Sequence, residues 1–442
     1  MKVLFFGFIY DYFRKIVDFS TVETSYKSIT NLILIVFSII LCYRFVYIAI
    51  GFFKKAPIYE DKEESSRFAV VIAARNEEKV IGHLLESLRK QTYDPTKITI
   101  FVVADNCTDR TASVARNLGA IVYERLNFHQ ISKGYALEFL FERIDQDYGI
   151  LSFDYFLFFD ADNLVKNTFI HEMNNALGAG FDVVTSFRNI KNFETNAISS
   201  GYGFHFYRNT LISHRPRAIL GCSTNVTGTG YAVRSELLKD GWHYTDLTED
   251  AEFSTNTIAH DFTIGYCEKA EIYDEQPTDL KTAWRQRLRW RKGGLRNFKH
   301  HSFKLFKNIF HKGSHKWSSY DMFWQTFPYD LISFVLALGV QIFGMVYSLV
   351  QTGRYDILIF LKYLGGFLLG GYLTSLGIGI LVLLKERKRL KNLGFGKRIL
   401  YLLLWPWFDI ISIVITIQAL FMRVEWKAIK HKDTRSIEEV NN

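Results

Sequence analysis

Residues 68–91 read FAVVIAARNEEKVIGHLLESLRKQ, and this stretch decides the fold. The first six residues, Phe68 to Ala73, form a continuous β-favouring run, which is typical of a parallel strand buried on both faces. After a polar turn, apolar residues recur at every third or fourth position from Val80 to Leu88, which is helical spacing. The stretch therefore predicts a strand, a turn and an amphipathic helix.

The same order recurs in KITIFVVADNCTDRTASVARNLGA, residues 97–120, where Thr108 or Asp109 is suited to cap the second helix. A third strand is expected at about residues 155–159. Such alternation favours an α/β fold with a doubly wound, mostly parallel sheet. No GxGxxG follows the first strand, which argues against a dinucleotide-binding fold.

Acidic and amide side chains follow the predicted strands. In doubly wound sheets ligands bind beyond the carboxyl ends of the strands, so these side chains are expected to converge. The segment LFFDADN, residues 157–163, is the most informative, because side chains at i and i+2 of an extended chain share a face. Two carboxylates that close favour a divalent cation between them, although a solvated turn is the alternative. The candidates are Asn76, Glu77, Asp105, Asp160 and Asp162.

Two further clusters carry chemistry. LTEDAEFS, residues 247–254, places Thr248, Glu249 and Asp250 at the start of a predicted helix, where an ordinary acidic cap is the alternative. WRQRLRWRKGG, residues 284–294, gathers five cations around two tryptophans, and its alternative is a helix on the membrane surface.

Four apolar stretches are long enough to span a bilayer, at about residues 31–53, 327–350, 355–384 and 398–422. The basic loop at residues 385–398 is expected to stay cytoplasmic, which puts the polar domain on the same side of the plasma membrane in a multi-pass protein. Pro406 and Asp409 suggest that the last stretch is broken or interfacial.

The expected organisation has four parts: an N-terminal interfacial segment with the first transmembrane helix, a cytoplasmic domain, interfacial helices, and C-terminal transmembrane helices with a short tail. Their bounds are 1–53, 54–278, 279–316 and 317–442. The net charge of +9 fits cytoplasmic loops, and no zinc-finger or RNA-binding signature supports a nucleic-acid partner. The four cysteines form no CxxC pair, so neither a disulfide framework nor a zinc site is indicated.

The motifs now resemble a known family. Asp105, the Asp160-Ala-Asp162 triplet, Thr248-Glu249-Asp250 and Gln286-Arg-Leu-Arg289-Trp290 are similar, in order and spacing, to the D, DxD, TED and QxxRW pattern of processive family 2 glycosyltransferases. These are membrane synthases of polysaccharides such as cellulose, chitin, hyaluronan and poly-N-acetylglucosamine. The resemblance implies a GT-A-like domain, a UDP-sugar donor and a Mg²⁺ or Mn²⁺ cofactor.

The resemblance also implies roles for the residues. Asp160 and Asp162 would hold the metal, and Asp250 would be the general base with Glu249 supporting it. Asp105, Asn76, Glu77 and Asp160 would bind the nucleotide-sugar, whereas acceptor and diphosphate would be held by Thr248, Gln286, Arg289 and Trp290. Lys133 is a further candidate for a phosphate contact, and an exposed lysine without function is the alternative.

The implied function is an inverting transferase that polymerises a UDP-hexose into a β-linked polysaccharide and moves it across the membrane. One alternative keeps the chemistry but transfers a single sugar to a lipid acceptor. Another is a nucleotide-binding membrane scaffold without catalysis. The expected partners are the UDP-sugar, a growing polysaccharide or lipid acceptor and membrane lipids, with no nucleic acid, and an oligomer is compatible with all of them.

Overall fold

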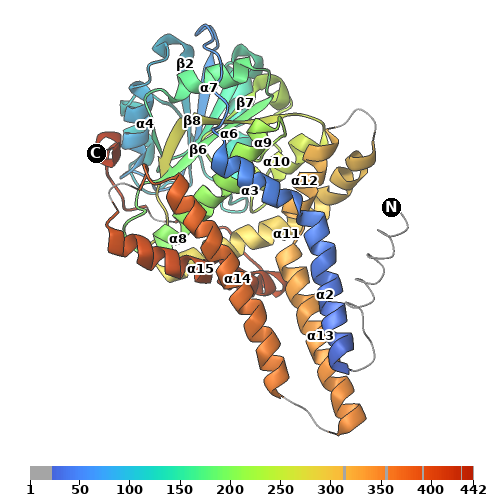
Figure 1. Cartoon of the computed structure of the whole chain (residues 1–442). Coiled ribbons are helices and arrows are strands. Elements are labelled where there is room, and N and C mark those ends of the chain that lie inside the picture. The colour runs from blue at the N-terminus through green and yellow to red at the C-terminus, as the bar shows by residue number, and fades with distance from the viewer. Residues whose placement is uncertain (1–21, 312–314, 354–356, 391–392, 430, 442) are drawn as a thin grey trace.

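The computed structural model describes residues 22–311, 315–353, 357–390, 393–429 and 431–441. An α/β domain forms the upper part of the molecule in Figure 1, and the long helices α2, α13 and α14 extend away from it (Val22–Leu41, Tyr329–Thr352 and Ile357–Lys385). The predicted interfacial segment at the start of the chain lies outside the described residues.

One sheet of eight strands organises the α/β domain, in the order β3-β2-β1-β4-β7-β6-β8-β5. The strands are β1 (Phe68–Ala74), β2 (Ile98–Asp105), β3 (Ile121–Arg125), β4 (Tyr155–Asp160), β5 (Leu164–Val165), β6 (Val183–Ile190), β7 (Tyr231–Arg234) and β8 (Ile264–Asp274). Strands β3, β2, β1 and β4 are all parallel, which confirms the predicted alternation for this half.

The other half of the sheet is mixed, and here the expectation of a mostly parallel sheet was too simple. Strand β7 runs antiparallel to both β4 and β6, and β5 runs antiparallel to β8, whereas β6 and β8 are parallel. Between β6 and β7 the chain does not cross the sheet but forms α8 (Ala197–Asn209) and α9 (Arg215–Ile219), which contact helices outside the domain. The chain therefore returns to the sheet in the opposite direction.

Helices cover both faces of the sheet, because β1 is apolar on both sides. Val70 and Ile72 belong to one buried cluster, and Ala69 and Val71 belong to the other. The helices of the domain are α4 (Ile81–Arg89), α5 (Thr111–Asn117), α6 (Lys133–Asp147), α7 (Phe169–Gly178) and α10 (Glu249–Ala259). The N-cap position of α5 is Arg110, not the predicted Thr108 or Asp109, although Asp109 Oδ1 accepts a hydrogen bond of 3.0 Å from the Thr111 amide.

Below the domain, the WRQRLRWRKGG segment belongs to one long helix, α11 (Leu280–Phe310), followed by α12 (Lys316–Thr326). Within the described residues, two helices are long and apolar enough to cross a membrane, Phe360–Lys385 and Phe395–Phe421. Two bent pairs bring the number to four if each counts as one span. They are Asn31–Leu41 with Tyr43–Phe53, bent by 48°, and Lys316–Thr326 with Leu331–Val346, bent by 54°.

The last predicted span corresponds to α15 (Phe395–Phe421), and this helix is continuous through Pro406 and is not broken. It crosses beneath the α/β domain in Figure 1, and it contacts α8, α11 and α14. Asp409, near its middle, forms an ion pair of 2.6 Å with Arg208 of α8. After α15 the chain returns to the domain, where Glu438 lies 2.5 Å from Lys90 beside α4.

Candidate active site

The carboxyl end of β2 supplies Asp105, a buried carboxylate. Arg125 Nη1, at the end of β3, donates a hydrogen bond of 2.7 Å to Asp105 Oδ1. Asp105 lines a large cavity together with Glu77, which follows β1. Burial raises the pKa of Glu77 to about 8, and Asp160 and Asp162 add to the rise. Asn76 is not among the lining residues. It has a φ of +59°, and its Oδ1 accepts a hydrogen bond of 2.8 Å from the Thr108 amide, which holds the turn.

Lys133, at the start of α6, joins the acids of two elements. Its ammonium group forms an ion pair with Asp160, donates a hydrogen bond of 2.7 Å to the carbonyl of Gly228 and lies 3.8 Å from Glu249. Its side chain is only 14% exposed, so the alternative of an exposed lysine is wrong. A buried cation paired with carboxylates from two motifs holds those motifs together and offers positive charge to a ligand between them.

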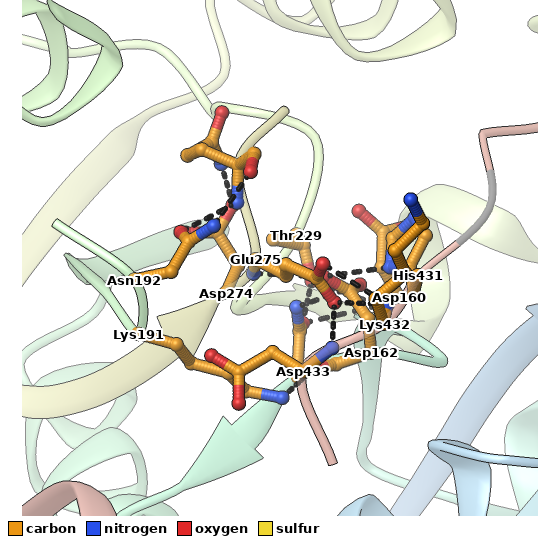
Figure 2. A network of polar contacts seen from close by, with 12 residues as sticks. Asp160, Asp162, Lys191, Asn192, Thr229, Asp274, Glu275, His431, Lys432 and Asp433 are labelled. Carbon is orange, nitrogen blue, oxygen red and sulfur yellow. Dashed lines mark hydrogen bonds and ion pairs between the residues drawn. The ribbon is translucent and has the colours of Figure 1, made fainter. Parts of the chain in front are cut away.

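Asp162, the second acid of the triplet, is met by a segment from the far end of the chain (Figure 2). Its Oδ2 accepts a hydrogen bond of 2.9 Å from the Glu275 amide and lies 3.2 Å from His431 Nδ1. Burial alone would raise the pKa of Asp162, but His431 and Lys191 lower it overall. Asp162 is therefore held as a carboxylate.

The segment that carries His431 is anchored to the domain on both sides of this contact. The amides of Lys432 and Asp433 each donate a hydrogen bond of 2.9 Å to the carboxylate of Glu275 (Figure 2). The Trp426 ring lies 5.8 Å from the Arg75 guanidinium. We call residues 423–441 the return segment.

The start of α10 presents the acids of the Thr-Glu-Asp motif to the same cavity. Burial raises the pKa of Glu249 to about 7, with Lys133 opposing and Asp250 adding to the rise. Burial also raises the pKa of Asp250, against the Ala251 amide and the cations Lys133, Arg289 and Arg188. An acidic cap would be solvated, whereas Glu249 is buried and Asp250 is half-buried in the cavity wall. Perturbed carboxyl groups in a cavity are typical of acid–base sites.

Helix α11 packs closely on this motif. Gly293 touches Thr248, because a Cβ on Gly293 would lie 2.2 Å from Thr248 Oγ1. Arg289 Nη1 donates a hydrogen bond of 2.6 Å to the Leu247 carbonyl. Trp290 packs edge-on against Tyr202, with ring centroids 5.6 Å apart. The side-chain oxygen of Gln286 is buried and has no hydrogen-bond partner among the described residues.

A single cavity of about 930 Å³ connects these groups. One end is lined by Asp105, Lys133 and Asp160, and the centre by Asp250 and Trp290. The other end lies among α13, α14 and α15 and is lined by Tyr329, Leu331, Phe367, Leu368, Gly371, Thr374, Ser375, Phe408, Asp409, Ile413 and Thr416. The volume lies at the upper end of the range for small-molecule sites, so it has room for two reactants.

Comparison with known proteins identifies the chain. Residues 66–293 match the family described as "Glycosyltransferase like family 2", which is more than half of the sequence. The chain belongs to glycosyltransferase family 2. The matched range contains every predicted motif, from the first strand to the tryptophan of the Gln-x-x-Arg-Trp segment. As a family 2 glycosyltransferase it is an enzyme, which removes the alternative of a scaffold without catalysis.

Relatives of this glycosyltransferase include the "Probable glycosyltransferase YdaM" of Bacillus subtilis, 24% identical over 64% of this chain and 67% of that protein. A "Beta-monoglucosyldiacylglycerol synthase" of Synechocystis is 25% identical over 52% of this chain and 48% of that protein. The chain thus spans about half the length of the Synechocystis relative. Among solved structures, the mannosyltransferase PcManGT of Pyrobaculum calidifontis, in complex with GDP-Man and Mn²⁺, has a TM-score of 0.54 at 13% identity, covering 88% of this chain and 99% of that one. This last likeness supports the fold.

The structure of this family 2 glycosyltransferase brings together all the predicted site residues except Asn76. Three groups were missed by the sequence analysis: Arg188, Glu275 and His431. Arg188 Nε donates a hydrogen bond of 2.8 Å to Asp274 and points its cation toward the acids. No local pattern marks these residues, because each follows or lies on an element of the mixed half of the sheet or the return segment.

Proposed function

We propose that this enzyme transfers one hexose from a UDP-sugar to the hydroxyl group of a membrane lipid, with inversion at the anomeric carbon. The observation that supports this most directly is the shape of the cavity. It runs from the acids at the strand ends, where a nucleotide-sugar would lie, to residues of the apolar helices α13, α14 and α15. A lipid acceptor lying among those helices reaches the acids without leaving its apolar surroundings.

At the donor end, Asp105 and Glu77 are proposed to face the nucleoside, and Lys133 the diphosphate. Asp105 Oδ1 is used by Arg125, and the second carboxylate oxygen remains available to a ribose or base. Lys133 is largely buried, positively charged and paired with Asp160. A buried ammonium group is a strong partner for phosphate oxygens, because the low local dielectric strengthens the attraction.

The donor set fits a Mg²⁺ or Mn²⁺ ion. Asp160 and Asp162 offer hard carboxylate oxygens, and His431 adds an imidazole nitrogen beside Asp162, a combination that Mn²⁺ accepts. Among the described residues, no group of three or more such side chains is already arranged as a complete metal site. When bound, the ion neutralises charge on the leaving diphosphate. Lys133 and His431 also place positive charge beside these carboxylates, and His431 would release its proton on binding the ion.

Asp250 is proposed as the general base. It lies against Gly228, since a Cβ on that glycine would be 3.5 Å from Asp250 Oδ2, and Gly228 is also bound by Lys133. Asp250, the proposed base, and Lys133, the proposed diphosphate contact, thus both touch the loop at Gly228. The acceptor oxygen bonds to the anomeric carbon as the bond to the diphosphate oxygen breaks, and its proton passes to Asp250. One displacement inverts the sugar configuration.

The name of the Synechocystis relative, a glucosyldiacylglycerol synthase, supports a lipid acceptor. Processive polymerisation is the second candidate, and the position of Trp290 favours it, because a tryptophan face in the cavity is suited to stack on a sugar. In both cases we propose that residues 54–278 form a cytoplasmic catalytic domain, that 279–316 lie at the membrane interface, and that the helices of 1–53 and 317–442 anchor the enzyme in the plasma membrane.

The test uses purified full-length enzyme in lipid nanodiscs with radiolabelled UDP-sugars and Mg²⁺ or Mn²⁺. Label in the solvent-extractable lipid fraction, dependent on metal and absent in Asp250→Asn, is the expected result. A high-molecular-weight polymer from the same donor would replace the proposal by the polymerase candidate. Transfer from GDP-sugars alone would overturn the donor assignment.

A further inference from the structure

The wall of the cavity carries a cluster of arginines around His205 of α8. Burial lowers the pKa of His205 well below its usual value, and the cations that add to this are Arg208, Arg287, Arg291 and Arg188. All five residues line the cavity. Positive charge is thus concentrated in a buried wall beside Trp290, whose ring is 6.2 Å from that of His205.

Two carboxylates offset part of this charge. Asp409 pairs with Arg208 at 2.6 Å and also accepts a hydrogen bond of 3.0 Å from Ser375, and Asp274 pairs with Arg188. Arg287 is held differently. Its guanidinium donates hydrogen bonds to the carbonyl of Phe408 and the hydroxyl of Ser412, and it lies 3.8 Å from the Phe408 ring centroid.

Neutral partners fix the orientation of Arg287 but do not neutralise it. Burial lowers the pKa of Arg287 to about 10, with Arg291 and Arg208 adding to the fall and Tyr202 and Asp409 opposing it. A buried cation without a compensating anion is costly, and an anionic ligand relieves that cost. Its guanidinium also has the planar geometry that matches phosphate oxygens.

The donor diphosphate does not account for this cluster, because other cations serve the reacting end. Lys133 donates a hydrogen bond to the carbonyl of Gly228, which lies against Asp250, and Arg289 donates one to the carbonyl of Leu247, just before the Thr-Glu-Asp motif. Arg287, by contrast, is bound to Phe408 and Ser412 of α15. Arg287, which would anchor the acceptor, therefore lies at a different place in the cavity from Asp250, which would take the proton. An acceptor that fits both places carries an anion and a separate hydroxyl group in the same head.

We infer that the acceptor is a membrane lipid whose head carries a phosphodiester and a free hydroxyl, such as phosphatidylglycerol, with the phosphodiester held by Arg287 and its neighbours. This inference rests on the proposed function and narrows it to one acceptor class. The lipid hydroxyl bonds to the anomeric carbon, its proton passes to Asp250, and the nucleoside diphosphate leaves. The phosphodiester is unchanged in the reaction.

The experiment compares two acceptors in phosphatidylcholine nanodiscs: dioleoylphosphatidylglycerol and dioleoylglycerol, which lacks the anion. The donor is the UDP-sugar that labels lipid in the test above, and labelled lipids are quantified by mass spectrometry. We expect kcat/KM for phosphatidylglycerol to exceed that for dioleoylglycerol by about tenfold or more, the effect of one charge-assisted contact. Phosphatidic acid, which offers phosphate without a free hydroxyl, is expected to inhibit, whereas soluble glycerol 3-phosphate is not.

Arg287→Gln is expected to bring the ratio between the two lipids close to one while KM for the donor is unchanged. Arg285→Gln is the matched control, because Arg285 lies on the same helix but is exposed. Equal or better use of dioleoylglycerol by the unmodified enzyme would overturn the inference and leave the proposed function standing. An Arg287→Gln enzyme with a raised donor KM and an unchanged lipid ratio would also overturn it. Polymer without labelled lipid would overturn the proposed function itself.

Discussion

The imidazole of His431 lies 3.2 Å from the carboxylate of Asp162, although His431 follows the last long helix and Asp162 lies in the turn after the central strand β4. The return segment thereby adds a nitrogen to the proposed metal side of the site. His431→Gln is expected to raise the Mn²⁺ concentration needed for half-maximal UDP binding by about 10- to 100-fold, as for residues that orient or ligate a metal.

Isothermal titration of the enzyme with Mn²⁺ in the presence of UDP measures this effect without turnover. His260→Gln is the control, because His260 is exposed at the end of α10. An unchanged Mn²⁺ requirement in His431→Gln would show that the contact with Asp162 serves only to hold the return segment.

Asp250→Asn removes the proposed base and keeps its size. We expect kcat to fall by about 10²- to 10⁴-fold, the usual contribution of general base catalysis, while the affinity for UDP stays within a factor of about two. Asp240→Asn, at an exposed position in the preceding loop, is expected to behave as the parent enzyme. Substantial residual turnover in Asp250→Asn would show that another residue is the base.

The pH dependence should follow the buried acids of α10. Burial raises the pKa of Glu249 to about 7 and raises that of Asp250, and a base acts only when unprotonated. The value of kcat/KM is therefore expected to rise with pH through the neutral region and then to level off. The contribution of these acids to the free energy of unfolding changes with pH in the opposite direction. Because the folded state binds their protons more tightly than the unfolded state, this stabilisation is complete below about pH 4.5 and is lost as the pH rises through about 7.

Glu249→Gln tests this assignment, because it removes the negative charge beside Asp250. The midpoint of the acid limb is expected to move to lower pH, and a profile of kcat/KM from about pH 5 to about pH 9 measures it. A midpoint that does not move would mean that neither acid of this pair controls the limb.

Gly293→Ala tests the contact between α11 and the Thr-Glu-Asp motif. The added Cβ would lie 2.2 Å from Thr248 Oγ1, so Thr248 or the helix must move. We expect a loss of about 1–3 kcal/mol in stability, as for other overpacked sites, and a lower kcat. Gly294→Ala is the matched control, since its Cβ meets nothing within 4 Å and alanine favours a helix. Thermal unfolding and kinetics of the pair separate packing from helix propensity, and equal behaviour would contradict the tight contact.

Lys133→Met removes the cation shared by two acidic motifs. Asp160 and Glu249 then lose their common partner, and we expect weaker UDP-sugar binding together with a lower unfolding temperature, because buried carboxylates are left without compensation. Lys79→Met, at an exposed position after β1, is the control. Isothermal titration measures the affinity of Lys133→Met for the donor, and an unchanged affinity would show that Lys133 does not contact the phosphates.

The parallel half of the sheet was predictable because its signals are local. A β-favouring run followed by helical spacing identified β1 with α4 and β2 with α5, and the side chains at their ends converged as expected. The mixed half gave no such signal: β7 has only four residues and follows the helices α8 and α9. Those helices contact helices outside the domain, and such contacts leave no local pattern in the sequence.

The candidate site divides in the same way. Asp105, Asp160 and Asp250 were found from their positions after strands or at a helix start, and Arg289 and Trp290 from their motif. Arg188 and His431 act through partners far along the chain, and neither belongs to a motif that predicts such a contact. Asn76 was predicted to belong to the site because it is polar and follows a strand. Its side chain instead holds the turn and does not line the cavity.

The position of the return segment orders the assembly of the enzyme during its synthesis. Residues 423–441 are translated after the catalytic motifs and after α15, so Asp162 meets His431 only once α15 has left the ribosome. In a nascent chain that lacks this segment, the proposed metal side of the site would lack His431. Sugar transfer that depends on this site would then wait until the helices proposed to hold the acceptor have been made.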